Sequence, residues 1–304
     1  MTIEAPFPWY GGKSLAAPAI WDALGANVGH YVEPFAGSLA TLLGRPGGPG
    51  VIETVCDKDA WIANFWRAAA ANPEELAKKV DWPVNEADLH ARHLRLHERH
   101  EAVREEIMTD PHYFDLTAAA WWVWGLCQWI GGTWCDGKKP RRQLPKLASQ
   151  NGVLRKRVGR SELVQWFSDL QARLRPVRVA CGDWTRVVTD SVLFCQQNGA
   201  ASTVGVLLDP PYAKGDMDYA AGGVGGELAE EVRQWAVERG EDRRLRIVLC
   251  GLESDHEMPT GWRKVLWSAK NGSRGVRSNG QSECLWLSPH CLGNRQPTLF
   301  QGFL

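Results

Sequence analysis

The feature that most constrains the fold is a repeated alternation of short apolar runs with longer helical stretches. Apolar runs of roughly four to eight residues between turn signals are typical of buried strands. Strands that alternate with helices along a chain form a mostly parallel sheet with helices on both faces. The sequence therefore predicts an α/β protein with a Rossmann-like, doubly wound sheet. We expect strands near Tyr31, Val51, Val177, Val204, Ile247, Val265 and Leu285.

A long helical segment interrupts this alternation between the second and third expected strands. Glu86–Met108 is strongly charged with helical spacing, and Leu116–Ile130 is apolar and bounded by two glycines. Ser161–Leu174 starts with a residue that suits an N-cap and stops before Pro176. We therefore predict a mainly helical insertion in the sheet domain.

A short motif, Asp-Pro-Pro-Tyr, follows the expected strand Val204–Leu208. It begins at Asp209, at a strand end, which is where ligands bind in open α/β sheets. A carboxylate and proline carbonyls accept hydrogen bonds, two prolines stiffen the backbone, and the tyrosine ring offers a stacking surface. These groups suit methylation of an exocyclic amine on a planar base. For the tetrapeptide alone, the alternative is a turn in which Asp caps and Tyr packs.

Three further segments place small or polar residues beside expected strands. Tyr31–Ser38 runs from a strand into a small-residue turn, which lets backbone N–H groups approach a ligand, and Leu39–Leu43 then starts a helix. Asp57 follows the next strand, about 20 residues beyond the glycine turn, where an acid is placed to hold ribose hydroxyls. Pro6–Lys13 has an aromatic pair, a Gly-Gly turn and one cation, which suit a zwitterionic nucleoside.

In this order, the four segments resemble those of the Dam-type DNA adenine-N6 methyltransferases. That family has Trp-x-Gly-Gly-Lys, Glu-Pro-Phe-x-Gly, an Asp after the second strand, and Asp-Pro-Pro-Tyr. The matching residues are 9–13, 33–37, 57 and 209–212, and the resemblance extends through 247–251 to 278–283. Residues 67–176 resemble the family only in position and general character. One departure is Leu39, where many members have a further glycine.

The resemblance implies an enzyme that transfers methyl from S-adenosylmethionine to N6 of a flipped adenine in double-stranded DNA. S-adenosylhomocysteine would be the second product, and no metal would take part. A catalytic domain of residues 1–66 and 177–304 would bind the cofactor, and residues 67–176 would form the target-recognition domain. The catalytic residues would be Asp209, Pro210, Pro211 and Tyr212. The cofactor-binding residues would be Trp9, Tyr10, Gly12, Lys13, Glu33, Pro34, Phe35, Ala36, Gly37, Ser38, Asp57, Lys58, Asp183, Trp184 and Asp209.

Asp183 and Trp184 follow the third expected strand. The resemblance favours a role in which Asp183 meets the cofactor's adenine amine and Trp184 flanks its ring. The alternative is that Asp183 only caps the next turn.

A basic loop lies within the expected insertion, at residues 136–160, where Asp136 is the only acid. Its glycines and prolines indicate irregular structure, and its cations suit contact with DNA phosphates. A solvated surface loop is the alternative. A second basic patch includes Arg274 and Arg277. The DNA-binding candidates are Trp134, Lys138, Lys139, Arg141, Arg142, Arg155, Lys156, Arg157, Arg274 and Arg277.

Aromatic, histidine and cysteine residues have simpler explanations. Trp121, Trp124 and Trp129 have helical spacing and are predicted to be core residues. Four histidines share one helix, at positions 90, 93, 97 and 100, and we predict a solvated face rather than a metal site. Six of the eight cysteines are predicted to be reduced and buried. These are Cys56, Cys127, Cys181, Cys195, Cys250 and Cys284.

Composition places the chain among ordinary globular proteins, with 44% hydrophobic residues, 23% charged residues and a net charge of zero. We expect no membrane span, no secretory signal and no obligatory protein partner. The expected location is the cytoplasm of a bacterium or phage-infected cell, on the nucleoid. The alternative functions are methylation of cytosine N4 or RNA adenine, or non-catalytic DNA binding. A restriction endonuclease would need an acidic metal site that the sequence lacks, so a cognate nuclease would be a separate chain.

Overall fold

The computed structural model describes residues 3–9, 13–47, 52–130, 134–135, 144–146, 152–154, 160–195, 203–211, 225–253, 255–267 and 283–293. The chain divides into two compact units. The first consists of Met1–Gly12, Gly37–Leu43 and Asp57–Val177, and the second of Lys13–Ala36, Gly44–Cys56 and Arg178–Leu304. The predicted domain boundaries at residues 67 and 176 stay a prediction.

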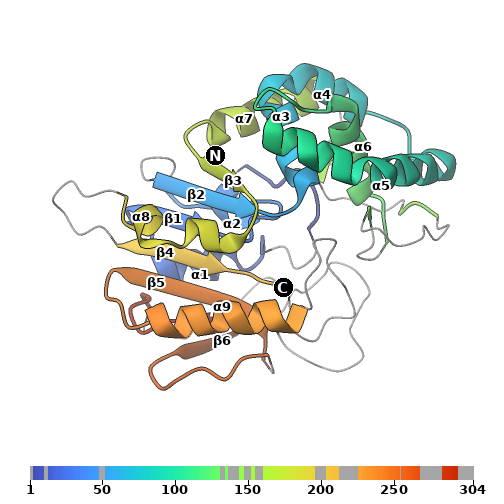
Figure 1. Cartoon of the computed structure of the whole chain (residues 1–304). Helices are drawn as coiled ribbons and strands as arrows, with labels where there is room; N and C mark the ends of the chain where they lie inside the picture. Colours follow the sequence, from blue (N-terminus) through green and yellow to red (C-terminus); the bar gives the residue numbers. More distant parts are fainter. Residues whose placement is uncertain are drawn as a thin grey trace, which may run out of the picture. The chain divides into compact units, whose positions relative to one another are not determined.

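The strands form one seven-stranded sheet with the order β3-β2-β1-β4-β5-β7-β6 (Figure 1). Its strands β1, β2, β4 and β5 pair in parallel, whereas β7 is antiparallel to both β5 and β6. The strand order reverses between β1 and β4, which is the switch point of a doubly wound sheet. The predicted Rossmann-like fold is confirmed. The bounds are β1 His30–Glu33, β2 Ile52–Asp57, β3 Arg178–Cys181, β4 Val204–Leu208, β5 Leu245–Leu252, β6 Arg263–Trp267 and β7 Glu283–Leu287.

Every residue of β4 is buried. Because alternate residues along a strand point to opposite faces, both faces of β4 are covered. Val206 and Leu208 share a core cluster with Val232 of α9. On the other face, a Cβ at Gly205 would lie 3.5 Å from the Leu24 side chain, at the end of α1. Figure 1 draws α9 in front of the sheet, between β5 and β6. The helices of this unit are α1 Ala17–Leu24, η2 Trp184–Val187, α8 Asp190–Leu193 and α9 Gly225–Arg239.

The first unit is helical, and its helices α3 to α7 lie between β2 and β3 in the sequence, as predicted. The sequence prediction of helix ends needs two corrections. The apolar helix α6 stops at Leu126, because the N–H groups of Gln128 and Trp129 both bond to the Gly125 carbonyl. Helix α7 already includes Arg160, so Ser161 is not its N-cap. The bounds are α2 Ala40–Leu43, α3 Ala60–Ala71, α4 Pro73–Val80, α5 Glu86–Thr109, α6 Leu116–Leu126, η1 Gly152–Leu154 and α7 Arg160–Leu174.

An aromatic cluster forms the core of the first unit. The Phe7 ring lies 4.9 Å from the Trp122 ring and 5.4 Å from the Phe65 ring. Burial of Trp124 and Trp129 confirms their predicted core roles. Trp121 is only partly buried, so the prediction is wrong for this residue. Its neighbour Trp122 is buried in the core instead.

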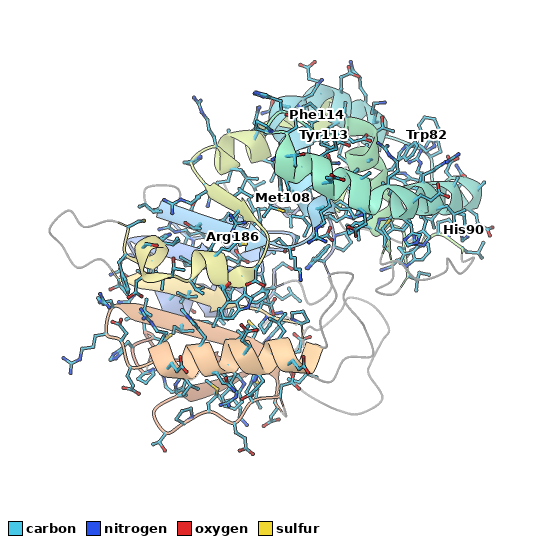
Figure 2. All side chains as sticks on the ribbon, viewed as in Figure 1. Trp82, His90, Met108, Tyr113, Phe114 and Arg186 are labelled. Carbon is cyan, nitrogen blue, oxygen red and sulfur yellow. The ribbon has the colours of Figure 1, made fainter. Side chains whose placement is uncertain are left out.

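His93 also belongs to this core, which corrects the prediction of a solvated histidine face. Its ring is 1% exposed and stacks on Trp129 at 4.7 Å. Its Nδ1 accepts the Cys135 N–H at 3.3 Å. His90 lies outside the buried set and is labelled on α5 in Figure 2. His90 is partly buried and also packs edge-on against Trp129, with 6.5 Å between the ring centroids.

Cysteine burial follows the prediction except at two positions. Cys56, Cys127, Cys250 and Cys284 are buried. Cys181 is only partly buried because β3 is an edge strand, and Cys195 is exposed because it lies beyond the end of α8. Among the described residues, no three His, Cys, Asp or Glu side chains are grouped to hold a metal ion. Within the same residues, no helix is both long and apolar enough to cross a bilayer.

Candidate functional site

The end of β4 carries a buried ion pair. The Lys13 ammonium lies 2.8 Å from Asp209 Oδ1, and the two side chains are 3% and 19% exposed. Lys13 comes just before α1, where its carbonyl accepts the N–H of Ala17. Pro210 is buried and Pro211 partly buried, whereas Tyr212 lies outside the described residues. The structure therefore puts the expected cofactor-binding lysine on the first residue of the Asp-Pro-Pro-Tyr motif.

Two opposing effects act on the Asp209 carboxyl. Burial raises its pKa, and the Lys13 ammonium partly offsets this by attraction and hydrogen bonding. A carboxylate withdrawn from water is costly unless it is paired. Lys13 thus both favours the anion and fixes the direction of one carboxylate oxygen.

The end of β1 is held by buried polar contacts. Glu33 is 4% exposed, and its Oε2 accepts the Tyr31 hydroxyl at 3.0 Å. Beyond Pro34, the Phe35 ring stacks on Trp184 with 6.0 Å between centroids. The Ala36 N–H bonds to the Cys56 carbonyl at 2.9 Å, which ties the turn after β1 to the end of β2.

The turn after β3 contains Asp183 and Trp184. Asp183 is exposed, and its Oδ1 accepts the Thr185 N–H at 3.0 Å and its hydroxyl at 2.6 Å. The capping alternative is therefore confirmed, while contact with a cofactor stays a prediction. Trp184 is 4% exposed, and its role beside the cofactor's ring also stays a prediction. Arg186, labelled in Figure 2, donates to the Cys181 carbonyl at 2.6 Å.

In the first unit, the glycine turn packs directly against Trp9. Gly37 has φ +47°, and a Cβ there would lie 2.5 Å from Trp9 Cδ1, so no other residue fits without displacement. The Gly37 N–H donates to Asp57 Oδ2 at 2.8 Å. Trp9 and Asp57 were both predicted to bind the cofactor, and in the structure both contact Gly37.

Leu39 replaces the second glycine of the resembling family, but it keeps a glycine-like backbone. Its φ is +60°, in the left-handed region that is unfavourable for a branched side chain. The side chain is fully buried, and the Leu39 carbonyl accepts the N–H of Leu43 at 2.9 Å. Packing of Leu39 thus holds a turn that glycine would adopt without strain, and Ser38 beside it is 4% exposed.

The Asp57 carboxylate, at the end of β2, accepts hydrogen bonds from several backbone N–H groups. Besides Gly37, the N–H of Asp59 donates to its Oδ1 at 3.0 Å. Burial raises the Asp57 pKa to about 6, against the lowering effect of these hydrogen bonds. Lys58, the other cofactor candidate here, is exposed.

One DNA-binding candidate is wrong. Trp134 is 8% exposed, and its Nε1 donates to the Trp122 carbonyl at 3.1 Å. Its ring fills the space above Gly125, where a Cβ would come within 1.9 Å of it. Trp134 is therefore a core residue. All the basic candidates lie outside the described residues, as do Tyr10 and Gly12.

Sequence reasoning missed two partners in the site. The first is the ion pair between Lys13 and Asp209: the resemblance assigned both residues to one cofactor site, but nothing in the sequence indicated that they pair. The second is Asp59, which caps α3 by accepting the Trp61 N–H at 2.7 Å. An acid directly before a helix is an N-cap signal, so this role was open to prediction.

Comparison with known families adds an independent finding. Residues 9–122 match the model of the D12 class N6 adenine-specific DNA methyltransferase family. The matched segment includes Trp9, Lys13, Gly37 and Asp57 and stops before Asp209. No curated protein matches the chain.

Proposed function

We propose that the chain is an N6 adenine-specific DNA methyltransferase, because residues 9–122 match the model of the D12 class of these enzymes. It would move the methyl group of S-adenosylmethionine to N6 of an adenine flipped out of double-stranded DNA. The observation that carries this proposal is the buried Lys13–Asp209 pair at the end of β4. It supplies an oriented carboxylate at the sheet edge where doubly wound folds bind ligands. A base inside a duplex is out of reach of such a site, so it must leave the stack.

The residues present suit S-adenosylmethionine. Glycine at position 37 lets the Trp9 ring lie directly against the turn after β1, which brings two of the proposed cofactor-binding residues together. Asp57, which comes after the second strand, has the chemistry to accept ribose hydroxyls. When bound, the cofactor supplies a methyl group already activated by its sulfonium. The proposed binding set is the one implied by the resemblance, from Trp9 to Asp209.

The chain's own task is then to orient an amine. The Asp209 carboxylate and the Pro210 carbonyl accept the two N6 hydrogens, which directs the nitrogen lone pair at the methyl carbon. Tyr212 stacks on the base. Lys13 keeps Asp209 anionic, so that it accepts rather than donates. The amine becomes acidic as it is methylated, and Asp209 or water takes the proton.

The test is direct methylation. The protein is expressed in a host free of DNA methylation, and its DNA is sequenced with detection of modified bases. We expect N6-methyladenine within one short sequence. N4-methylcytosine instead, or methylation of RNA alone, would overturn the proposal.

We also propose that the basic loop of residues 136–160 contacts DNA phosphates, whatever the base sequence of the DNA. Replacing Arg141, Arg142, Arg155 and Arg157 by Ala should weaken binding to all duplexes equally. It should also reduce the salt dependence, by up to about one unit of slope per lost contact. Titration of a fluorescent duplex at several salt concentrations measures both. An unchanged slope would leave Arg274 and Arg277 as the DNA-contacting cations.

A further inference from the structure

The Lys13 ammonium, which pairs with Asp209, also lies over an aromatic ring. Its Nζ is 5.9 Å from the centre of the Trp267 ring and 2.8 Å from Asp209 Oδ1. Lys13 is 3% exposed and Trp267 is 7% exposed, so their contact is withdrawn from water. All three residues belong to the second unit. One buried cation therefore contacts both a carboxylate and an indole.

Trp267 reaches this ion pair from a distant strand. It is the last residue of β6, and Asp209 directly follows β4. Strands β5 and β6 are both antiparallel to β7, and β5 is parallel to β4, so both residues lie at the carboxyl edge of the sheet. Because β5 and β7 separate β4 from β6, those two strands are about 14 Å apart. The long side chains of Lys13 and Trp267 together bridge this gap.

The indole attracts the ammonium for a physical reason. The face of an aromatic ring carries partial negative charge, and its attraction for a cation is stronger where water is excluded. A lysine side chain has a flexible four-carbon stem, so each contact of its ammonium narrows the directions that it can take. The Trp267 ring therefore favours the position in which Lys13 meets Asp209.

We propose that Trp267 is a positioning residue that holds the Lys13 ammonium against Asp209. Its effect on methyl transfer rests on the proposed function, in which Lys13 keeps Asp209 anionic and directs one of its oxygens. Trp267 acts through Lys13 and not on the reacting atoms. The edge strand β6 thereby takes part in a site whose other residues precede α1 and follow β4.

The first test compares two variants of Trp267. Trp267→Leu removes the ring, whereas Trp267→Phe keeps a ring that attracts cations less strongly. We expect methyl transfer to fall about tenfold in Trp267→Leu and by less in Trp267→Phe. In Lys13→Met, adding Trp267→Leu should cause no further loss, because no ammonium is left to hold. Losses that multiply would overturn the inference, because Trp267 would then act independently of Lys13.

The matched control is Trp286 on the neighbouring strand β7. The Lys264 Nζ lies 5.5 Å from the centre of its ring, but this lysine is 36% exposed and pairs with Glu253. Trp286→Leu removes the same ring from the same sheet, and we expect methyl transfer to stay near that of the parent protein. An equal loss in Trp267→Leu and Trp286→Leu would overturn the inference, because damage to the sheet would explain both.

A change of charge without a change of fold tests the attraction itself. Tryptophan with an increasing number of ring fluorines is placed at position 267 alone, since fluorine withdraws negative charge from the ring face. We expect transfer to fall stepwise along this series and to stay constant along the same series at position 286. Constant transfer along the series at position 267 would overturn the inference, because the contact would then be only steric.

A readout without substrate separates this inference from the proposed function. Lysine labelled with carbon-13 at Cε gives a magnetic resonance signal for Lys13, which Lys13→Met identifies. The signal should move in Trp267→Leu, which removes the field of the ring, and stay in place in Trp286→Leu. An unmoved signal in Trp267→Leu would overturn the inference, whatever the protein methylates. If the signal moves but the parent protein methylates no DNA, the proposed function fails while the positioning of Lys13 by Trp267 stands.

Discussion

The ends of β2 and β4 each carry a carboxylate, but the two are stabilised differently. Asp209 faces an ammonium, that of Lys13 at 2.8 Å. Asp57 faces backbone N–H groups, and the charge of another acid, Asp59, disfavours its anion. Burial raises the pKa of both. The difference lies in what opposes burial, which is a full charge at one site and dipoles at the other.

This difference shows that one fold can control the ionisation of two buried carboxyl groups in different ways. A paired carboxylate keeps its charge and direction, which an acceptor for amine hydrogens requires. A carboxylate held by dipoles and raised to a pKa of about 6 changes its charge near neutral pH. If Asp57 accepts the ribose hydroxyls, as we propose, ligand binding should depend on pH. At Asp209, the Lys13 ammonium works against such a dependence.

The largest effect should come from removing the paired carboxylate. Asp209→Ala should lower methyl transfer by about a thousandfold or more, because the amine loses its oriented acceptor. Transfer of labelled methyl to DNA measures the loss, and circular dichroism checks the fold. Asp190→Ala is the control, since Asp190 is an exposed acid of the same unit paired with Arg239. Activity of Asp209→Ala within tenfold of the parent would remove the proposed mechanism.

Removing the ammonium should have the next largest effect. In Lys13→Met the Asp209 pKa rises further, because the ammonium no longer opposes the effect of burial, so less of the carboxyl is ionised at any given pH. Transfer should fall by about 10–100-fold at pH 7 and recover in part as the pH rises through the new pKa. The stability cost should be about 3 kcal/mol in urea unfolding. Lys264→Met, which breaks the surface pair with Glu253, should cost less than about 1 kcal/mol. A pH-independent loss would mean that Lys13 acts on the ligand rather than on Asp209.

The carboxylate at the end of β2 should affect binding rather than chemistry. Asp57 is an anion above its pKa of about 6, so affinity for S-adenosylhomocysteine should be full at pH 8 and fall as the pH drops through about 6. Asp57→Asn should weaken binding about tenfold at pH 8 and flatten this profile. Calorimetry at several pH values tests both. A flat profile in the parent protein would break the contrast between the two acids.

The smallest effect should come from the turn that supports Asp57. Gly37→Ala should destabilise the protein by about 1–3 kcal/mol, because it combines an unfavourable φ with a collision against Trp9. Gly47→Ala is a matched control, since Gly47 has φ +91° and nothing within 4 Å of an added Cβ. Because φ +91° is less favourable for alanine than φ +47°, a larger cost of Gly37→Ala than of Gly47→Ala in urea unfolding would be due to the collision. Equal costs would show that Trp9 moves aside freely.

Much of the fold could be predicted because its signals are local. The run Val204–Leu208 became β4 with every residue buried, as a short apolar run between turns indicates. The charged helix expected at Glu86–Met108 ends one residue later, at Thr109. The spacing of apolar residues in a helix and the length of a strand depend on residues close together in the chain, so both can be predicted from the sequence. The order of motifs also placed Asp57 and Asp209 at strand ends, which the structure confirms.

Burial and pairing were decided only by the tertiary structure. Trp134 stands beside a basic loop in the sequence, yet it fills the space over Gly125. Lys13 and Asp209 are far apart in the chain and meet only because α1 and β4 belong to one packed unit. Leu39 adopts a left-handed φ that its residue type disfavours. In each case the outcome depends on contacts between residues distant in sequence, which no local pattern encodes. A strained backbone angle such as that of Leu39 persists only where the surrounding packing holds it.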